Sequence, residues 1–315
     1  MNEPIINPQT VMEAANILRR GEICAFPTET VYGLGADATN ADAVLAVYEA
    51  KGRPRFNPLI VHCADLDMVR KIVHFPPLAQ KLSSFWPGPL SLVLPLREDA
   101  GICDIVTAGL DTLAVRIPEH KMARELIGAV GKPLAAPSAN PSGKLSPTSA
   151  GQVIAGFSGK VPVLDGGPCA AGLESTIIAI SGDQAVQLRA GALARQDIER
   201  TLGQSVEVAR QGSAVKAPGM LTSHYAPMSK LCLNVTDPID GQVYLAFGAT
   251  PDFDGPTLNL SPAADLTEAA RNLFAYLHQL DALGAKTIAV APIPSKGLGE
   301  AINDRLQRAA APPEN

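Results

Sequence analysis

Apolar residues recur at helical spacing in several separate segments of the chain. Val11, Ala14 and Leu18 fall on one face of a helix, and Gly21 ends that pattern. The same three-four spacing returns further along, where Asn40 stands in the N-cap position. In the first 206 residues this spacing predicts helices over residues 8–20, 41–51 and 121–130.

Short apolar runs bounded by proline, glycine or polar residues lie between and after these helices. Runs of this length fit buried strands better than helices. The predicted strands cover residues 23–26, 59–63, 90–96, 112–117, 134–137, 161–165 and 175–180. Strands and helices alternate, but without the strict regularity of repeated βαβ units. We therefore predict an α/β fold with a twisted, mixed sheet.

Both periodicities disappear between Glu207 and Met228, where Gly212, Pro218 and Pro227 mark a loop. A loop of about 20 residues is unusual inside a compact domain, so this segment is interpreted as a linker. After it, the pattern predicts strands over 231–235, 243–247 and 287–291 and helices over 265–283 and 298–310. The predicted organisation is a larger domain over 1–206, a linker over 207–228 and a small, Rossmann-like α/β domain over 229–315.

The composition excludes several classes of protein. Of the 315 residues, 46% are apolar and 18% are charged, which excludes a disordered chain. Glycine and proline, with 27 residues each, exclude the long uninterrupted helices of a coiled coil. The net charge is −5, so the basic excess of a dedicated nucleic-acid binder is missing, and any site for a polyanion must be a local pocket.

The cysteines and the apolar runs indicate the cellular compartment of the protein. The five cysteines are widely spaced and form no C-x-x-C pair, which argues against a disulfide framework and against a structural zinc site. The first residues lack the basic and apolar segments of a signal peptide, and no run of 18 apolar residues occurs. We expect a cytoplasmic protein with no membrane partner.

A polar loop over residues 28–35 follows the first predicted strand. Its two threonines supply hydroxyl groups, and its two glycines let backbone amides approach an anion. An ordinary turn with a capping threonine is an equal alternative. Gly33, Gly35 and Ala38 also fit the loose dinucleotide fingerprint, but this match is weak because no ribose-binding acid is clearly placed.

A basic loop follows the second predicted helix. Lys51, Arg53 and Arg55 lie within five residues, and a glycine and two prolines restrict the backbone around them. Cations near a helix C-terminus are favourable by themselves, which is the alternative explanation. A rigid basic loop nevertheless suits phosphate better than a solvated face does.

Two polar residues interrupt predicted strands. His62 lies in the apolar run after the basic loop, where a buried core histidine is the commoner explanation unless the ring faces the same pocket. Arg116 lies in the run over 112–117, where burial without a partner would be costly. Either an acidic side chain or an anionic ligand should therefore neutralise Arg116.

The remaining polar groups suit binding rather than covalent catalysis. Residues 137–143 form a rigid loop of short hydroxyl and amide side chains, and Arg189 stands just before Gly191. The chain contains no P-loop motif, no G-x-S-x-G and no H-E-x-x-H, and its five histidines do not pair at metal-binding spacing. Separate cations, hydroxyls and amides without a nucleophile suit nucleotide binding, with catalysis by positioning and charge neutralisation.

Several short motifs occur together in a particular order. They are residues 26–34, Lys51-Gly52-Arg53-Pro54, Asn57-Pro58-Leu59 with His62, and Pro137-Ser138-Ala139-Asn140. This combination resembles the YrdC-like family of threonylcarbamoyl-AMP synthases over about residues 8–205. Residues 218–220 and 224–227 resemble the linker of the longer family branch, which carries a second, smaller C-terminal domain. The resemblance implies that residues 1–206 form a YrdC-like catalytic domain.

The resemblance implies a nucleotidyltransferase that converts L-threonine, bicarbonate and ATP into L-threonylcarbamoyl-AMP and pyrophosphate. The product would serve threonylcarbamoyladenosine formation in tRNA through downstream transfer proteins, with tRNA contacted only indirectly. Threonine and bicarbonate can form a carbamate without a protein nucleophile or acid–base residue. Mg²⁺ would arrive with ATP rather than in a metal site of the protein.

The resemblance also implies roles for individual residues. Arg116 would pair with the carboxylate of threonine, and Tyr225 in the linker would close over the pocket as a lid. The residues implied around threonine are Thr30, His62, Arg116, Ser175 and Thr176. Those implied around ATP are Lys51, Arg53, Asn57, Thr112, Ser138, Asn140, Ser146, Arg189 and Tyr225.

Two other functions are alternatives at this point. One is a double-stranded RNA-binding or tRNA-binding module that uses the same basic loop without ATP chemistry. The other is a carbamoyl-transfer domain of the hydrogenase-maturation type. Such domains belong to longer chains with zinc-finger and acylphosphatase-like segments, which this sequence lacks.

Overall fold

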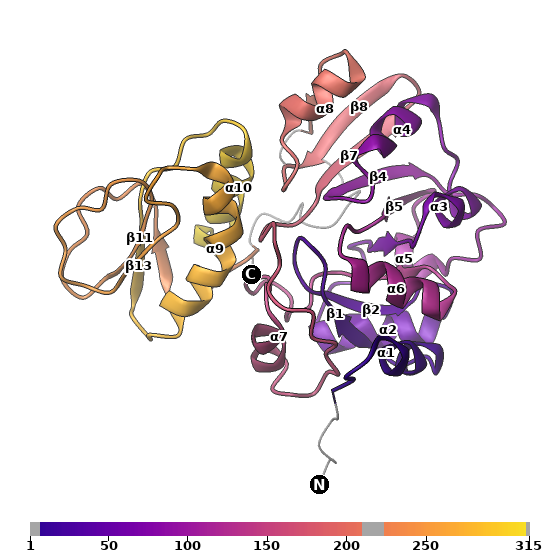
Figure 1. Ribbon diagram of the computed structural model, residues 1–315, viewed down its shortest axis with the longest axis horizontal. Coiled ribbons are helices and arrows are strands. Elements are labelled where there is room, and N and C mark those ends of the chain that lie inside the picture. The colour runs from indigo at the N-terminus through magenta and orange to yellow at the C-terminus, as the bar shows by residue number, and fades with distance from the viewer. Residues whose placement is uncertain (1–6, 210–223, 313–315) are drawn as a thin grey trace, which may run out of the picture.

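The computed structural model describes residues 7–209, here called the N-terminal domain, and residues 224–312, here called the C-terminal domain (Figure 1). The sheet of the N-terminal domain consists of β1 (Cys24–Phe26), β2 (Gly33–Asp37), β3 (Ile60–His62), β4 (Leu90–Pro95), β5 (Thr112–Arg116), β6 (Leu134–Ala135), β7 (Thr176–Ser181), β8 (Gln184–Arg189) and β9 (Glu207–Val208). Their order across the sheet is β1-β2-β6-β3-β5-β4-β7-β8-β9. Parallel and antiparallel pairs both occur, so the predicted mixed sheet is confirmed.

Helices alternate with these strands along the chain. They are α1 (Val11–Arg19), α2 (Ala41–Lys51), α3 (Leu66–Ile72), α4 (Pro77–Leu82), the 3-10 helix η1 (Ser83–Phe85), α5 (Asp104–Thr107), α6 (Lys121–Val130), α7 (Ala150–Gly156) and α8 (Arg195–Leu202). The side chain of Asn40 accepts hydrogen bonds from the backbone amides of Asp42 and Ala43, which begins α2 as predicted. Gly52 ends α2 at a φ of 60°, in the left-handed region that favours glycine.

The two faces of this sheet differ, and the difference positions the candidate site. Along β5, Leu113 and Val115 pack into the main hydrophobic core. The opposite face carries a small apolar strip of Ile60, Val93, Ala114 and Ile177. Because side chains alternate along a strand, Arg116 lies on the same face as Ala114. One face is therefore core, and the other combines an apolar strip with polar residues.

Two details of the prediction are wrong. The sequence pattern places Gly33 and Gly35 in a loop, but both lie in β2, which pairs with β1 in antiparallel fashion. A Cβ on Gly35 would lie 2.8 Å from a ring carbon of Phe26, so glycine here makes room for that ring rather than for a phosphate. Residues 161–165 form no strand; Val163 makes an isolated bridge with Ala25 instead.

The C-terminal domain has a smaller sheet in which all the pairs are parallel. It consists of β10 (Lys230–Cys232), β11 (Val243–Ala246), β12 (Thr257–Asn259) and β13 (Thr287–Val290), in the order β10-β13-β11-β12. The helices α9 (Leu266–Asp281) and α10 (Leu298–Ala310) lie between this sheet and the N-terminal domain (Figure 1). The predicted small α/β unit is confirmed, although the sequence pattern did not show β12.

The hydrophobic core of the C-terminal domain extends into the N-terminal domain. Its buried cluster includes Val31, Leu145 and Leu173 together with residues of α9 and α10. At Gly172, φ is +70°, and a Cβ would lie 2.3 Å from the carbonyl oxygen of Arg271 on α9. Only glycine permits this close approach. Side chains of the N-terminal domain thus complete the core of the C-terminal domain, while the main core of the N-terminal domain is separate.

The predicted linker over 207–228 is described only at its two ends. Residues 207–208 form β9, and residues 224–228 are described at the start of the C-terminal domain. Residues 210–223 lie outside the described residues. In the part of the chain that is described, no helix is long and apolar enough to cross a membrane.

Candidate active site

A cavity lies on the sheet face that carries the apolar strip, since Ile60 of that strip and Arg116 both line it. The predicted residues that line it are Thr30, Arg53, His62, Arg116, Ser138, Ser175, Arg189 and Tyr225. The other lining residues, to which the resemblance assigned no substrate, are Thr28, Val31, Gly33, Ile60, Ala136, Pro137, Glu174 and His224. Three arginines face one glutamate, so the lining carries an excess of positive charge that suits an anionic ligand.

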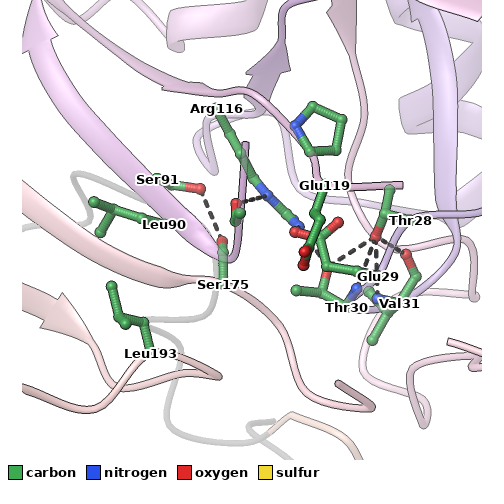
Figure 2. A network of polar contacts seen from close by, with 12 residues as sticks. Thr28, Glu29, Thr30, Val31, Leu90, Ser91, Arg116, Glu119, Ser175 and Leu193 are labelled. Carbon is green, nitrogen blue, oxygen red and sulfur yellow. Dashed lines mark hydrogen bonds and ion pairs between the residues drawn. The ribbon is translucent and has the colours of Figure 1, made fainter. Parts of the chain in front are cut away.

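The loop between β1 and β2 forms one wall of the cavity. The hydroxyl of Thr28 accepts hydrogen bonds from the backbone amides of Thr30 and Val31 and donates one to the carbonyl oxygen of Val31 at 2.6 Å (Figure 2). The hydroxyls of Thr28 and Thr30 lie 2.8 Å apart and share a further hydrogen bond. A threonine turn of this kind fixes the backbone without a regular element. It holds the hydroxyl of Thr30 toward Arg116.

Arg116 ends β5 and is neutralised by an acidic side chain, Glu29. Its NH2 group donates to Oε1 of Glu29 at 2.5 Å, and its NH1 group donates to the hydroxyl of Thr30 at 2.8 Å (Figure 2). Its Nε donates to the carbonyl oxygen of Gly88 at 3.2 Å. A guanidinium has five N–H donors in a rigid plane, so these contacts fix its orientation at the cavity wall.

His62 lies beside Arg116 in the parallel register of β3 and β5 and lines the cavity. Its ring packs edge-to-face on Phe26, with ring centroids 6.0 Å apart. Burial, followed by the neighbouring charge of Arg116, lowers the pKa of His62 to about 3, so the ring is neutral at pH 7. Its Nδ1 atom is buried and has no hydrogen-bond partner among the described residues. His62 therefore faces the pocket, which is the condition under which the sequence favoured a binding role.

The side chains of Ser175 and Thr176 point in different directions at the start of β7. The hydroxyl of Ser175 lies 2.8 Å from that of Ser91 (Figure 2). It also accepts a hydrogen bond from Arg189 at 3.2 Å. The hydroxyl of Thr176 instead donates to the carbonyl oxygen of Leu193 at 2.6 Å and does not line the cavity. Alternation along the strand thus turns Ser175 toward the site and Thr176 away from it.

Two of the three cations of the basic loop, Lys51 and Arg53, are buried. Lys51 donates from Nζ to the carbonyl oxygens of Ser138 at 2.6 Å and Asn140 at 2.5 Å, so it supports the cavity wall from behind. Burial, and then the charge of Arg53, lowers the pKa of Lys51 well below its usual range. Arg55, by contrast, is exposed.

Arg53 lines the cavity, and its guanidinium bonds to later residues of the same loop. Its Nε and NH2 groups donate to the carbonyl oxygens of Asn57 at 3.3 Å and Pro58 at 3.0 Å. Burial lowers the pKa of Arg53 to about 10. Both amide atoms of Asn57, and Oδ1 of Asn140, are buried without hydrogen-bond partners among the described residues. Such atoms are costly unless a polar ligand or water completes them.

Ser146 and Glu174 form a polar group next to Arg189. The hydroxyl of Ser146 donates to Oε1 of Glu174 at 2.5 Å, and Arg305 of α10 donates to Oε2 at 2.8 Å. Burial alone would raise the pKa of Glu174, but the charges of Arg305 and Arg189 and the hydrogen bond from Ser146 lower it to about 2. Glu174 is therefore ionised at pH 7. Ser146 reaches the cavity only through Glu174, because it does not line the cavity itself.

Tyr225 closes the cavity on the side of the C-terminal domain. It is 2% exposed, and its ring packs on Phe274 of α9 with centroids 5.5 Å apart. The ring of His224 lies 4.1 Å away, and the guanidinium carbon of Arg305 lies 5.2 Å from the centroid of the Tyr225 ring. Burial lowers the pKa of His224 to about 3, so this ring is neutral as well.

Thr112 is a predicted ATP residue that does not line this cavity. It begins β5, whereas Arg116 ends the strand, and it lines a separate hollow with His74, Phe75 and Asp111. Adjacent strand residues are about 3.3 Å apart, so roughly 13 Å of strand separates the two. Thr112 and Arg116 are only four residues apart in the chain, but they lie at opposite ends of the extended strand β5.

The sequence prediction missed several residues of the site. Some of them stand beside predicted residues, and one has no recognisable signal in the sequence. Glu29 and His224 stand inside the motifs, and Glu174 stands directly before the predicted Ser175. Adjacent predicted residues were therefore a usable signal for all three. Arg305 had none, because its partner Glu174 lies 131 residues away in the chain.

The chain is similar to known proteins along nearly its whole length. Residues 16–191 match the Sua5, YciO and YrdC family described as "Telomere recombination", and residues 193–311 match the family described as "Threonylcarbamoyl-AMP synthase, C-terminal domain". The threonylcarbamoyl-AMP synthase of Pyrococcus abyssi is 41% identical, covering 94% of this chain and 93% of its own. That of Bacillus subtilis is 38% identical, covering 96% and 94%. The crystal structure of P. abyssi Sua5 complexed with L-threonine superposes with a TM-score of 0.87 at 39% identity, covering 95% and 94%.

The fold is α/β, and the full-length relatives define its class as a nucleotidyltransferase. The chain belongs to the Sua5/YrdC family, in its long branch with two domains. Its activity is that of a threonylcarbamoyl-AMP synthase. This activity replaces the two alternatives that the sequence left open, an RNA-binding module without ATP chemistry and a hydrogenase-maturation domain.

Proposed function

We propose that the cavity joins L-threonine, bicarbonate and ATP into L-threonylcarbamoyl-AMP and pyrophosphate. The amine of threonine attacks the carbon of bicarbonate and water leaves, which gives a carbamate. A carbamate oxygen then attacks the α-phosphorus of ATP, the bond to the bridging oxygen breaks, and pyrophosphate leaves. The observation that carries the proposal is that one positively charged cavity contains both Arg116 with Thr30 and His62, and Arg53 with Ser138 and Arg189.

The threonine end of the cavity is assigned to Arg116 and its neighbours. The fixed guanidinium suits the carboxylate of threonine, because Arg–carboxylate pairs are planar and charge-assisted. Thr30, His62 and Ser175 supply polar atoms around it, and Val31, Ile60 and Ala136 supply apolar contacts. A neutral His62 can accept a hydrogen bond from the amine without repelling it. Thr176 supports this end by holding the segment at Leu193.

The phosphate end is assigned to Arg53, Ser138 and Arg189. They line the cavity, while Lys51, Asn57, Asn140 and Ser146 lie in the shell directly behind them. Stabilising charge on the phosphates requires fixed donors rather than a nucleophile, and buried cations provide these without reorganisation. Tyr225 covers this end and excludes water from the mixed anhydride that forms.

We propose that the nucleoside of ATP extends from the cavity along the sheet face. The apolar strip of Ile60, Val93, Ala114 and Ile177 lies between the cavity and the hollow at Thr112. A purine is flat and apolar on its faces, so it can lie on this strip while the ribose or base edge reaches the hydroxyl of Thr112. This path accounts for Thr112 as an ATP residue although it lies away from the phosphates.

We assign Mg²⁺ to the substrate rather than to the protein. Among the described residues, no group of three or more His, Cys, Asp or Glu side chains lies together as a metal site would. Mg²⁺ commonly keeps several waters and binds through substrate phosphates, so no such group is needed. The ion would neutralise charge on the triphosphate.

The two domains divide the work in this proposal. Residues 1–206 bind the substrates, residues 207–228 link the domains and supply Tyr225, and residues 229–315 hold that residue in place. The product leaves for downstream transfer proteins that modify tRNA in the cytoplasm. The net charge of −5 favours indirect rather than direct contact with tRNA.

Pyrophosphate release by the purified protein tests the proposal. Release from ATP should require threonine and bicarbonate together, because neither alone presents a carbamate oxygen. Mass spectrometry of the nucleotide product should show threonylcarbamoyl-AMP. Reactions that omit threonine, bicarbonate or Mg²⁺ are the controls. Equal turnover without threonine would contradict the proposal.

A further inference from the structure

One arginine of the C-terminal domain contacts two walls of the cavity without lining the cavity itself. Arg305 on α10 is 1% exposed. Its Nε donates to Oε2 of Glu174 at 2.8 Å, and its guanidinium carbon lies 5.2 Å from the centre of the Tyr225 ring. Glu174 and Tyr225 both line the cavity, on segments far apart in the chain. Arg305 therefore connects two walls that come from different domains.

Glu174 transmits this contact to the substrate-binding residues. Its other oxygen accepts the hydrogen bond from Ser146, and its own backbone carbonyl accepts one from the amide of Ala192 at 2.9 Å. Ser175, the next residue, lines the cavity and bonds to Arg189. A displacement of Glu174 would therefore move Ser175 and Arg189 with it.

The backbone of Tyr225 requires an external support. Its φ is +63°, a left-handed conformation that a bulky side chain rarely adopts. Such conformations persist where the surroundings determine them, and they occur often at functional sites. Here the surroundings are Phe274 on one side and the guanidinium of Arg305.

We propose that Arg305 is a positioning residue of the synthase reaction, which sets Glu174 and Tyr225 against the substrates. The inference rests on the proposed function. A buried ion pair adds little stability compared with well-packed apolar residues of the same volume, because the cost of desolvation offsets its attraction. The arrangement is therefore explained by geometry: a planar guanidinium can pair with a carboxylate and stack on a ring at the same time, which an ammonium group cannot do.

The first test compares two substitutions on the same helix. Arg305→Met removes the contact to both walls. Glu300→Gln is the matched control, because Glu300 also makes polar contacts across the domain junction, with Gln187 at 2.7 Å and Arg195 at 3.5 Å, but neither of these lines the cavity. We expect Arg305→Met to lower kcat by roughly ten- to a hundred-fold, the range for misplaced catalytic groups. Glu300→Gln should leave kcat at the wild-type value, and equal losses in both would overturn the proposal.

A double-mutant cycle separates positioning from stability. If Arg305 acts through Tyr225, then Arg305→Met should lower kcat much less in a Tyr225→Ala background than in the wild type. Additive losses would overturn the proposal. If Arg305→Met does not fold, Arg305→Lys takes its place in the cycle, since it keeps the charge and loses the planar contact.

ATP affinity, measured by calorimetry without threonine, distinguishes a failure of the proposed function from a failure of the role assigned to Arg305. A wild-type protein that binds ATP but releases no pyrophosphate with threonine and bicarbonate contradicts the proposed function. An Arg305→Met protein that binds ATP and turns over as the wild type does contradicts the role of Arg305 alone.

Discussion

Two buried arginine–glutamate pairs border the same cavity, and they are built differently. Arg116 and Glu29 belong to one domain, and the remaining contacts of Arg116 are to Thr30 and Gly88 of that domain. Arg305 and Glu174 belong to different domains. Arg116 itself lines the cavity, whereas in the second pair the glutamate does. The comparison indicates that the first arginine is presented to a ligand, while the second is used to hold the walls.

The largest expected effect is at the first pair. Arg116→Ala removes a charge-assisted contact to the threonine carboxylate, worth about 1.5–3 kcal/mol. The KM for threonine should rise by roughly ten- to 150-fold, with a smaller change in the KM for ATP. Initial rates over a threonine series measure this, and Arg116→Lys should recover part of the loss because an ammonium lacks the planar fork. If ATP binding were lost while threonine dependence stayed the same, our division of the cavity would be wrong.

The next effect concerns the phosphate end. Arg189→Ala should mainly raise the KM for ATP, by about tenfold or more, because Arg189 lines the cavity beside Ser138 and Arg53. Arg53→Ala should act in the same direction. Arg97→Ala is the control, since Arg97 forms an exposed pair with Asp99. An unchanged KM for ATP in both cavity variants would argue against this assignment.

The third effect concerns the second pair and the pH dependence of the free energy of unfolding. The pKa of Glu174 is lowered from 4.5 to about 2 in the folded protein. Its stabilising contribution is therefore complete above pH 4.5 and is lost as the pH falls toward 2. Glu174→Gln should flatten the fall of the unfolding free energy in this window by about 1.4 kcal/mol per pH unit. Chemical denaturation at several pH values measures the slope, with the exposed Glu125→Gln as control.

The smallest effect is expected at an ion pair away from the cavity. Lys132 bonds to Asp37 at 2.7 Å, and its side chain is 53% exposed. Lys132→Ala should lower the free energy of unfolding by no more than about 1 kcal/mol, because the lysine is half-exposed and the buried carboxylate of Asp37 keeps its hydrogen bonds from Thr39. It should leave kcat unchanged. A loss of turnover in this variant would show that kinetics respond to ion pairs in general, and the contrast between the two cavity pairs would lose its meaning.

The sequence was sufficient for what depends on local pattern. The helices over 41–51, 121–130 and 298–310 have the predicted bounds, because apolar spacing indicates all three and the cap Asn40 marks the start of the first. The need of Arg116 for a neutralising partner also followed from its place in an apolar strand. Its actual partner, Glu29, is visible only when β1, β2 and β5 are assembled.

What the sequence could not show depends on contacts between distant segments. The glycines at 33 and 35 suggested a phosphate loop, but the Phe26 ring occupies that space. Lys51 could be predicted as a cation but not as a buried one, since its acceptors are the carbonyls of residues 138 and 140. Arg305 reads as one more polar residue on an amphipathic helix, and only the domain junction shows its contacts.

The apolar core of the C-terminal domain has a consequence for how the enzyme can be recombined. Val31, Leu145 and Leu173 belong to the first half of the chain but complete the core of the second. A chimera that exchanges the C-terminal domain for that of a relative would keep these three side chains against a surface they did not evolve with. The natural unit of exchange is therefore the helices α9 and α10 together with the three residues they cover, rather than the stretch of chain that follows the linker.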